Sequence, residues 1–105
     1  MKLKIIFWVC LLLISSCANE EKRISKIKEI DQNKEMVLTY KEAYEALDKD
    51  DIYFAAKKFL EAELLYPQSV WAPKSALMAS YSYYLQNYYA EALSNLERYL
   101  RTYPT

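Results

Sequence analysis

Residues 40–67 read YKEAYEALDKDDIYFAAKKFLEAELLYP and decide the fold of this 105-residue chain. Ala, Leu, Glu and Lys dominate the stretch, and its apolar residues recur every three or four positions, which is typical of amphipathic helices. The DKDD sequence offers Asp50 as an N-cap, and Pro67 ends the second apolar pattern. The stretch therefore predicts a helical hairpin, with two helices joined by a short turn.

The same pattern continues around this hairpin and predicts an all-α fold. β-branched residues are few, and Ser69 and Asn87 stand where further helices need N-caps. Pro73 falls in the first turn of one of these helices, and Pro104 ends another. The expected helices lie near residues 36–48, 51–65, 70–85 and 88–102.

The four expected helices form two copies of one unit. A shift of 37 residues places Pro67 on Pro104. It also pairs Ala55 with Ala92, Phe59 with Leu96, Tyr66 with Tyr103, Tyr44 with Tyr81 and Asp50 with Asn87. The unit resembles the tetratricopeptide repeat, a helical hairpin of about 34 residues with small and aromatic residues at fixed places. We expect two such repeats, 36–68 and 69–105, in a truncated array, because these arrays generally need three or more repeats.

The first 16 residues are expected to be a lipoprotein signal peptide. Lys2 and Lys4 precede an apolar run over residues 5–14, which is shorter than the roughly twenty residues of a membrane span. The sequence LISSC at residues 13–17 resembles the bacterial lipobox. The resemblance implies that Cys17 is acylated, becomes the first residue after cleavage and anchors the chain.

Two other uses of the cysteines are less consistent with the sequence. A disulfide between Cys10 and Cys17 would lie within the amino-terminal targeting segment, and two cysteines without His are too few ligands for a metal. Ala18 follows Cys17, at the place where lipoproteins retained in the inner membrane usually carry Asp. The resemblance thus implies attachment to the inner leaflet of the outer membrane, facing the periplasm.

Residues 17–35 form a charged linker rich in Glu and Lys. Ile24, Ile27 and Ile30 could lie on one face of a short helix, but no wider apolar stripe accompanies them. We expect this segment to be a mobile leash with solvated charges.

The composition excludes several function classes. Lys plus Arg and Asp plus Glu number 14 each, and no basic run could follow a phosphate backbone, so we expect no nucleic acid partner. The chain has no Gly, which excludes glycine-rich phosphate loops, and no His, which is the commonest general base. We therefore expect no enzyme, and no catalytic residue, metal, cofactor or small-molecule substrate.

Two more specific motifs point to a family. They are YPxSxWA at residues 66–72 and LMxxYxxY at residues 77–84. Together with the lipobox they resemble the amino-terminal part of the BamD family, tetratricopeptide lipoproteins of the outer-membrane β-barrel assembly machinery. The resemblance implies a non-catalytic scaffold whose partners are β-barrel assembly subunits and unfolded outer-membrane proteins. The alternative is another periplasmic tetratricopeptide lipoprotein, an adaptor of the cell-division or pilus-assembly type.

The first helix of each repeat is expected to line the concave side of such an array. The candidate peptide-binding residues on these helices are Tyr40, Tyr44, Leu47, Lys74, Leu77, Tyr81 and Tyr84. Tyr offers a large apolar face with little rotamer entropy and a hydroxyl that stays hydrated, which suits a groove for an extended peptide. The alternative for the four tyrosines is packing between helices, and the sequence does not separate the two.

Overall fold

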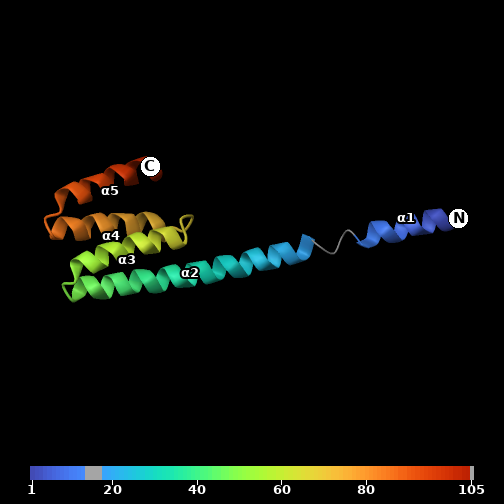
Figure 1. The fold of residues 1–105 in the computed structure, drawn as a ribbon, viewed down its shortest axis with the longest axis horizontal. Coiled ribbons are helices and arrows are strands. Elements are labelled where there is room, and N and C mark those ends of the chain that lie inside the picture. Colours follow the sequence, from blue (N-terminus) through green and yellow to red (C-terminus); the bar gives the residue numbers. More distant parts are fainter. Residues whose placement is uncertain (14–17, 105) are drawn as a thin grey trace. The chain divides into compact units, whose positions relative to one another are not determined.

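The computed structural model describes residues 1–13 and 18–104, and every regular element in these ranges is a helix (Figure 1). The helices are α1 (Lys2–Leu13), α2 (Ala18–Asp48), α3 (Ile52–Leu65), α4 (Trp71–Leu85) and α5 (Tyr89–Thr102). The all-α prediction is confirmed, and α2 to α5 form the two expected tetratricopeptide-like hairpins. The chain divides into two compact units, Met1–Asp31 and Gln32–Thr105.

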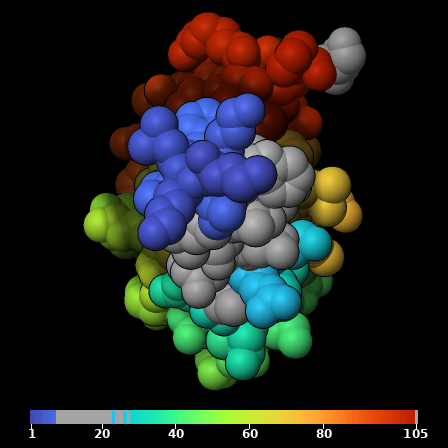
Figure 2. Space-filling model, turned by 90° about the vertical axis from the view of Figure 1, so that its right-hand side faces the viewer, coloured from blue at the N-terminus to red at the C-terminus, as the bar shows by residue number. Residues whose placement is uncertain are grey.

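The amino-terminal unit contains α1. Its apolar side chains Leu3, Ile5, Ile6 and Phe7 are exposed, and Figure 2 shows the side chains at this end in blue. Within the described ranges, none of the helices combines the length and the apolar character that crossing a membrane requires. The proposed lipid attachment residue, Cys17, lies outside the described residues.

Helix α2 is longer than the sequence predicted. We expected a helix over 36–48 after a linker over 17–35, whereas α2 begins at Ala18 and continues to Asp48. The charged segment is therefore helical, because Glu and Lys are good helix formers and neither Gly nor Pro interrupts it. Ile30 is exposed, and Met36 is the first buried residue among those of α2 whose burial is described.

The two hairpin turns do not use the predicted N-caps. Asp50 and Asn87 have φ values of 63° and 60°, and neither side chain caps the following helix. Instead, each follows the end of a helix in the left-handed conformation that Gly usually supplies and that Asp and Asn tolerate. The Asp51 N–H donates to the Ala46 carbonyl at 2.9 Å, and the Tyr88 N–H donates to the Tyr83 carbonyl at 3.0 Å. Both turns are thus Schellman-type helix endings.

The connection between the hairpins follows the sequence prediction. The backbone N–H of Trp71 donates to Oγ of Ser69 at 3.1 Å, so Ser69 caps the start of α4 as expected. Pro73 is the third residue of α4, where its missing N–H costs nothing. Helices α3 and α5 end at Leu65 and Thr102, and their C-caps are the tyrosines that precede Pro67 and Pro104.

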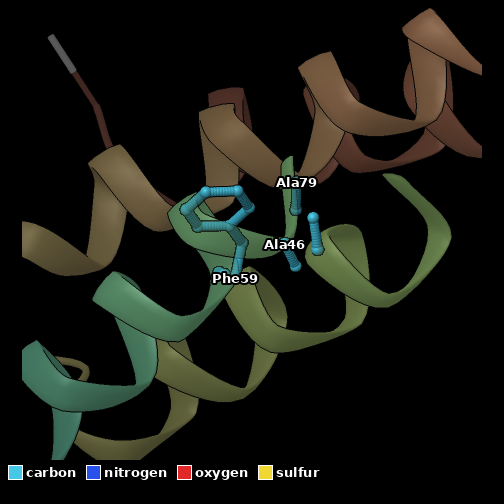
Figure 3. Packing of buried hydrophobic residues seen from close by; sticks show 5 residues of the cluster. Ala46, Phe59 and Ala79 are labelled. Atoms are coloured by element: carbon cyan, nitrogen blue, oxygen red, sulfur yellow. The ribbon is translucent and has the colours of Figure 1, made fainter. Parts of the chain in front are cut away.

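Buried residues of the second unit form two clusters, and in the larger one the ring of Phe59 is surrounded by alanines (Figure 3). Phe59 of α3 is fully buried beside Ala46 of α2 and Ala79 of α4. Tyr40 packs edge-on against Phe59 with ring centroids 5.2 Å apart, and Trp71 lies equally close to Tyr40. The small residues let three helices approach closely, and the ring fills the space they leave.

Serine hydroxyls on α4 are compatible with this close packing because each finds a partner on its own helix. Ser75 donates to the Trp71 carbonyl at 2.8 Å, and Ser82 donates to the Met78 carbonyl at 2.8 Å. These bonds satisfy polar groups that burial would otherwise destabilise. Helix α4 can therefore be covered on two sides, by α3 and by α5.

A buried carboxylate joins α3 to α5. Glu63 is 4% exposed and accepts two hydrogen bonds from Arg98, at 2.8 and 2.7 Å, and one from the Tyr103 hydroxyl at 2.6 Å. Burial raises the pKa of Glu63, but the hydrogen bonds from Arg98 and Tyr103 and the charge of Arg98 outweigh it and lower the pKa overall. Burial and the bond to Glu63 raise the pKa of Tyr103 to about 12. The ionised carboxylate thus stabilises the contact between the two repeats.

We expect Phe59→Ala to lower the free energy of unfolding by about 3–5 kcal/mol, because it removes a buried ring and leaves a cavity. Urea unfolding followed by circular dichroism measures this loss. Phe54→Ala is the matched control, because Phe54 lies on the same helix but is 46% exposed. Equal losses for the two variants would contradict the packing described here.

The Glu63 contact predicts a pH dependence of stability. Since folding lowers the pKa of Glu63, the stabilisation is present above its ordinary value of 4.5 and is lost as the pH falls through the lower folded pKa. Glu63→Gln should cost about 1.5–3 kcal/mol at neutral pH and flatten the acid part of the stability profile. Glu97→Gln, at an exposed site on α5, is the control. If the stability of Glu63→Gln varied with pH as that of the original chain does, Glu63 would not be the source of the acid sensitivity.

Candidate peptide-binding surface

The structure separates the seven candidate residues into a packed and an exposed group. Tyr40 and Leu47 pack against the cluster around Phe59 and are only partly exposed. Burial raises the pKa of the Tyr40 phenol, and the neighbouring Tyr44 adds to the rise. These two residues of α2 therefore contribute mainly to the contact with α3 and α4.

The other five candidates are exposed. They are Tyr44 on α2 and Lys74, Leu77, Tyr81 and Tyr84 on α4. The Lys74 ammonium lies 4.6 Å from the centroid of the Trp71 ring, a cation–π distance. Tyr84 packs against Tyr89 of α5 with centroids 5.7 Å apart. Lys74 thus lies over the aromatic face of Trp71 at the start of α4.

Three of the exposed candidates share a groove with α5. A hollow of about 280 Å³ lies between α4 and α5. It is lined by Leu77, Ser80, Tyr81, Tyr84, Ala92 and Leu96. The sequence reasoning identified the first-helix residues Leu77, Tyr81 and Tyr84 but missed Ala92 and Leu96, although the 37-residue shift places these on Ala55 and Phe59.

The repeat explains the shape of this groove. The same shift converts its lining into six residues of the first hairpin: Tyr40, Ala43, Tyr44, Leu47, Ala55 and Phe59. All of these except Tyr44 belong to the cluster that receives Ala79 of α4. In the first hairpin these residues form the surface on which α4 packs, and we call such a surface a helix seat. The groove between α4 and α5 is therefore the equivalent seat of the second hairpin.

Tyr44 and Tyr81 occupy equivalent positions at the edges of the two helix seats, and both are about half exposed. Tyr44 remains 50% exposed although α4 occupies the seat beside it, and Tyr81 is 49% exposed beside an open groove. The packing of α4 therefore leaves Tyr44 exposed, and the repeat predicts the same for Tyr81 if a helix fills the groove. The two tyrosines form a repeated pair on the first helices of the two hairpins, which we call the tyrosine ladder.

The ladder offers apolar contact and hydrogen bonding but no reactive group. Each ring presents an apolar face with few rotamers to lose, and each hydroxyl can donate and accept. Within residues 1–13 and 18–104, no group of His, Cys, Asp or Glu is arranged to hold a metal ion. The arrangement suits non-covalent recognition of a chain segment.

Comparison with known proteins agrees with the motifs. A family model described as "Outer membrane lipoprotein", named YfiO, matches residues 31–105. The chain is 31% identical over 91 residues to the "Outer membrane protein assembly factor BamD" of Caulobacter vibrioides, which is 87% of this chain but 29% of that relative. No solved structure gives a significant match. The resemblance drawn from the motifs is confirmed, and the chain belongs to the YfiO family of outer membrane lipoproteins.

Proposed function

We propose that this chain is a lipid-anchored, non-catalytic scaffold of the outer-membrane β-barrel assembly machinery. In this proposal it binds targeting segments of unfolded outer-membrane proteins together with partner subunits. Its relative in Caulobacter vibrioides is an outer membrane protein assembly factor, which supports a role in assembly, and membership of a family of outer membrane lipoproteins supports the outer membrane as its location. The chain spans 29% of that relative, so these roles are proposed for the region that the chain covers.

The tyrosine ladder is the observation that carries the proposal. Tyr44 and Tyr81 repeat at the same position of two adjacent hairpins and stay about half exposed. Aromatic side chains spaced by a structural repeat suit an extended peptide that crosses successive helices. The ladder would thus recognise apolar or aromatic residues of a client through ring faces, while the tyrosine hydroxyls remain hydrated.

The proposed anchor is the acylated sulfur of Cys17. A single myristoyl-length chain binds a membrane only marginally, whereas several acyl chains on one residue hold firmly. The anchor would keep the two hairpins at the inner leaflet of the outer membrane, on the periplasmic side. No catalytic step is needed, because the scaffold acts by holding an unfolded client near its partners.

The ladder is tested by replacing Tyr44 and Tyr81 together with Ala. We expect photo-crosslinking to a peptide from an unfolded outer-membrane protein to fall several-fold while the helical circular dichroism signal is retained, because both rings are exposed. Phe54→Ala removes a ring of similar exposure from α3 and should leave crosslinking unchanged. Full crosslinking in the double variant would assign the two rings to packing instead.

The anchor is tested by Cys17→Ser. We expect the variant to move from the membrane pellet to the soluble fraction after cell lysis, since the residue proposed for acylation has lost its thiol. Cys10→Ser is the matched control, because Cys10 would be removed with the signal peptide, and it should stay in the membrane fraction. Retention of Cys17→Ser in the membrane would show that the anchor lies elsewhere.

A further inference from the structure

A second aromatic cluster lies where the turn between α4 and α5 meets the start of α3. Tyr53 of α3, Tyr83 of α4 and Tyr88 of the turn have pairwise centroid distances of 6.1 to 6.5 Å and interplanar angles of 69° to 74°. These three rings and Glu91 of α5 line a hollow of about 340 Å³. We call this arrangement the tyrosine cage. It contains none of the residues of the tyrosine ladder.

The local fold explains why the three rings meet. Asn87 adopts a positive φ, and the Tyr88 N–H then donates to the Tyr83 carbonyl, so the turn returns Tyr88 to the end of α4. Tyr53 comes from the other hairpin and approaches Tyr83 because α3 packs on α4. Tyr83 is buried, whereas Tyr53 and Tyr88 are about half exposed. Solvent therefore reaches the cage on the side of Tyr53 and Tyr88.

The chemistry of the cage favours a cation. The face of an aromatic ring is negative and attracts an ammonium or guanidinium group within about 6 Å of the centroid. A cation between the three centroids would lie within that reach of all of them. Glu91 adds a carboxylate at the rim and, in the first turn of α5, also offsets the positive end of the helix dipole.

The structure already shows one cation drawn to this cluster. The Lys57 ammonium lies 4.9 Å from the centroid of the Tyr53 ring. Lys57 does not line the hollow. Its charge should therefore repel a second cation in the cage, and removing it should strengthen binding. A site for an anion would show the opposite response.

We propose that the tyrosine cage is a binding site for the alkylammonium group of a lysine side chain on a partner peptide. The partner class rests on the proposed function, whereas the preference for a cation rests on the three rings and Glu91 alone. The cage would complement the tyrosine ladder by selecting a basic residue in a segment that the ladder holds by apolar contact.

The test compares a short acetylated and amidated peptide containing Lys with the same peptide containing norleucine, titrated into the full chain and followed by NMR chemical shifts. The two side chains differ mainly in charge. We expect the Lys peptide to bind about tenfold more tightly, as one good cation–π site allows. Equal binding of both peptides, or binding of neither, would overturn the proposal.

Variants assign the binding to the cage. Tyr88→Ala should weaken the Lys peptide about tenfold while Tyr88→Phe, which keeps the ring, should not. Glu91→Gln changes an exposed residue and should weaken binding of the Lys peptide, because it removes the carboxylate at the rim. Lys57→Gln removes a competing positive charge and should strengthen binding. Tyr89→Ala removes a neighbouring exposed ring outside the cage and is the matched control. Weakening by Tyr89→Ala but not by Tyr88→Ala would contradict the assignment.

Two further measurements distinguish a peptide partner from a lipid headgroup and the cage from the ladder. Phosphoethanolamine carries an alkylammonium group in the form of a lipid headgroup, and tighter binding of this probe than of the Lys peptide would overturn the choice of a peptide partner. Replacing Tyr44 and Tyr81 with Ala should leave the affinity of the Lys peptide unchanged. Failure of the ladder and failure of the cage can therefore be told apart.

Discussion

The close approach of α2, α3 and α4 around the ring of Phe59 is the constraint on which the second unit depends. Alanines at the contact points bring the helices together, and the buried ring fills the space between them. This packing aligns the first helix of one hairpin with the first helix of the next. The tyrosine ladder depends on that alignment, whereas the groove beside it is lined by residues of α4 and α5 alone. The Glu63 contact then holds the second hairpin against the first at the far end of α5.

Much of this fold could be predicted because local signals and tertiary packing agree. The starts of α3, α4 and α5 differ from the predicted ones by one residue, and their ends coincide with the prediction. Apolar periodicity and the Tyr-Pro pairs both mark these helices. The prediction that Asp50 and Asn87 are N-caps was wrong. Asp and Asn favour N-caps but also tolerate a left-handed φ, and the sequence does not show which of the two roles they take. Because the chain has no Gly, Asp50 and Asn87 supply the left-handed residues that end α2 and α4.

Other features of the fold and the site depend on contacts between distant residues or on helix continuation, which residue spacing does not show. The helical start of α2 was missed because charge and low hydrophobicity suggested a leash, although the same residues favour helix once a helix is present. The Glu63 and Arg98 pair joins residues 35 positions apart and has no counterpart in the repeat. Of the candidate site, the α4 residues could be predicted from the repeat, whereas the division between packed Tyr40 and exposed Tyr44 required the position of α4.

Hydrogen exchange of the full chain, with and without a peptide carrying the targeting segment of an unfolded outer-membrane protein, tests the central claim most directly. The claim is that a client lies across the first helices of the two hairpins. It predicts slower amide exchange around Tyr44 of α2 and Tyr81 of α4 when the peptide is bound, with exchange in α3 unchanged. Protection confined to α5, or no protection in either first helix, would contradict it.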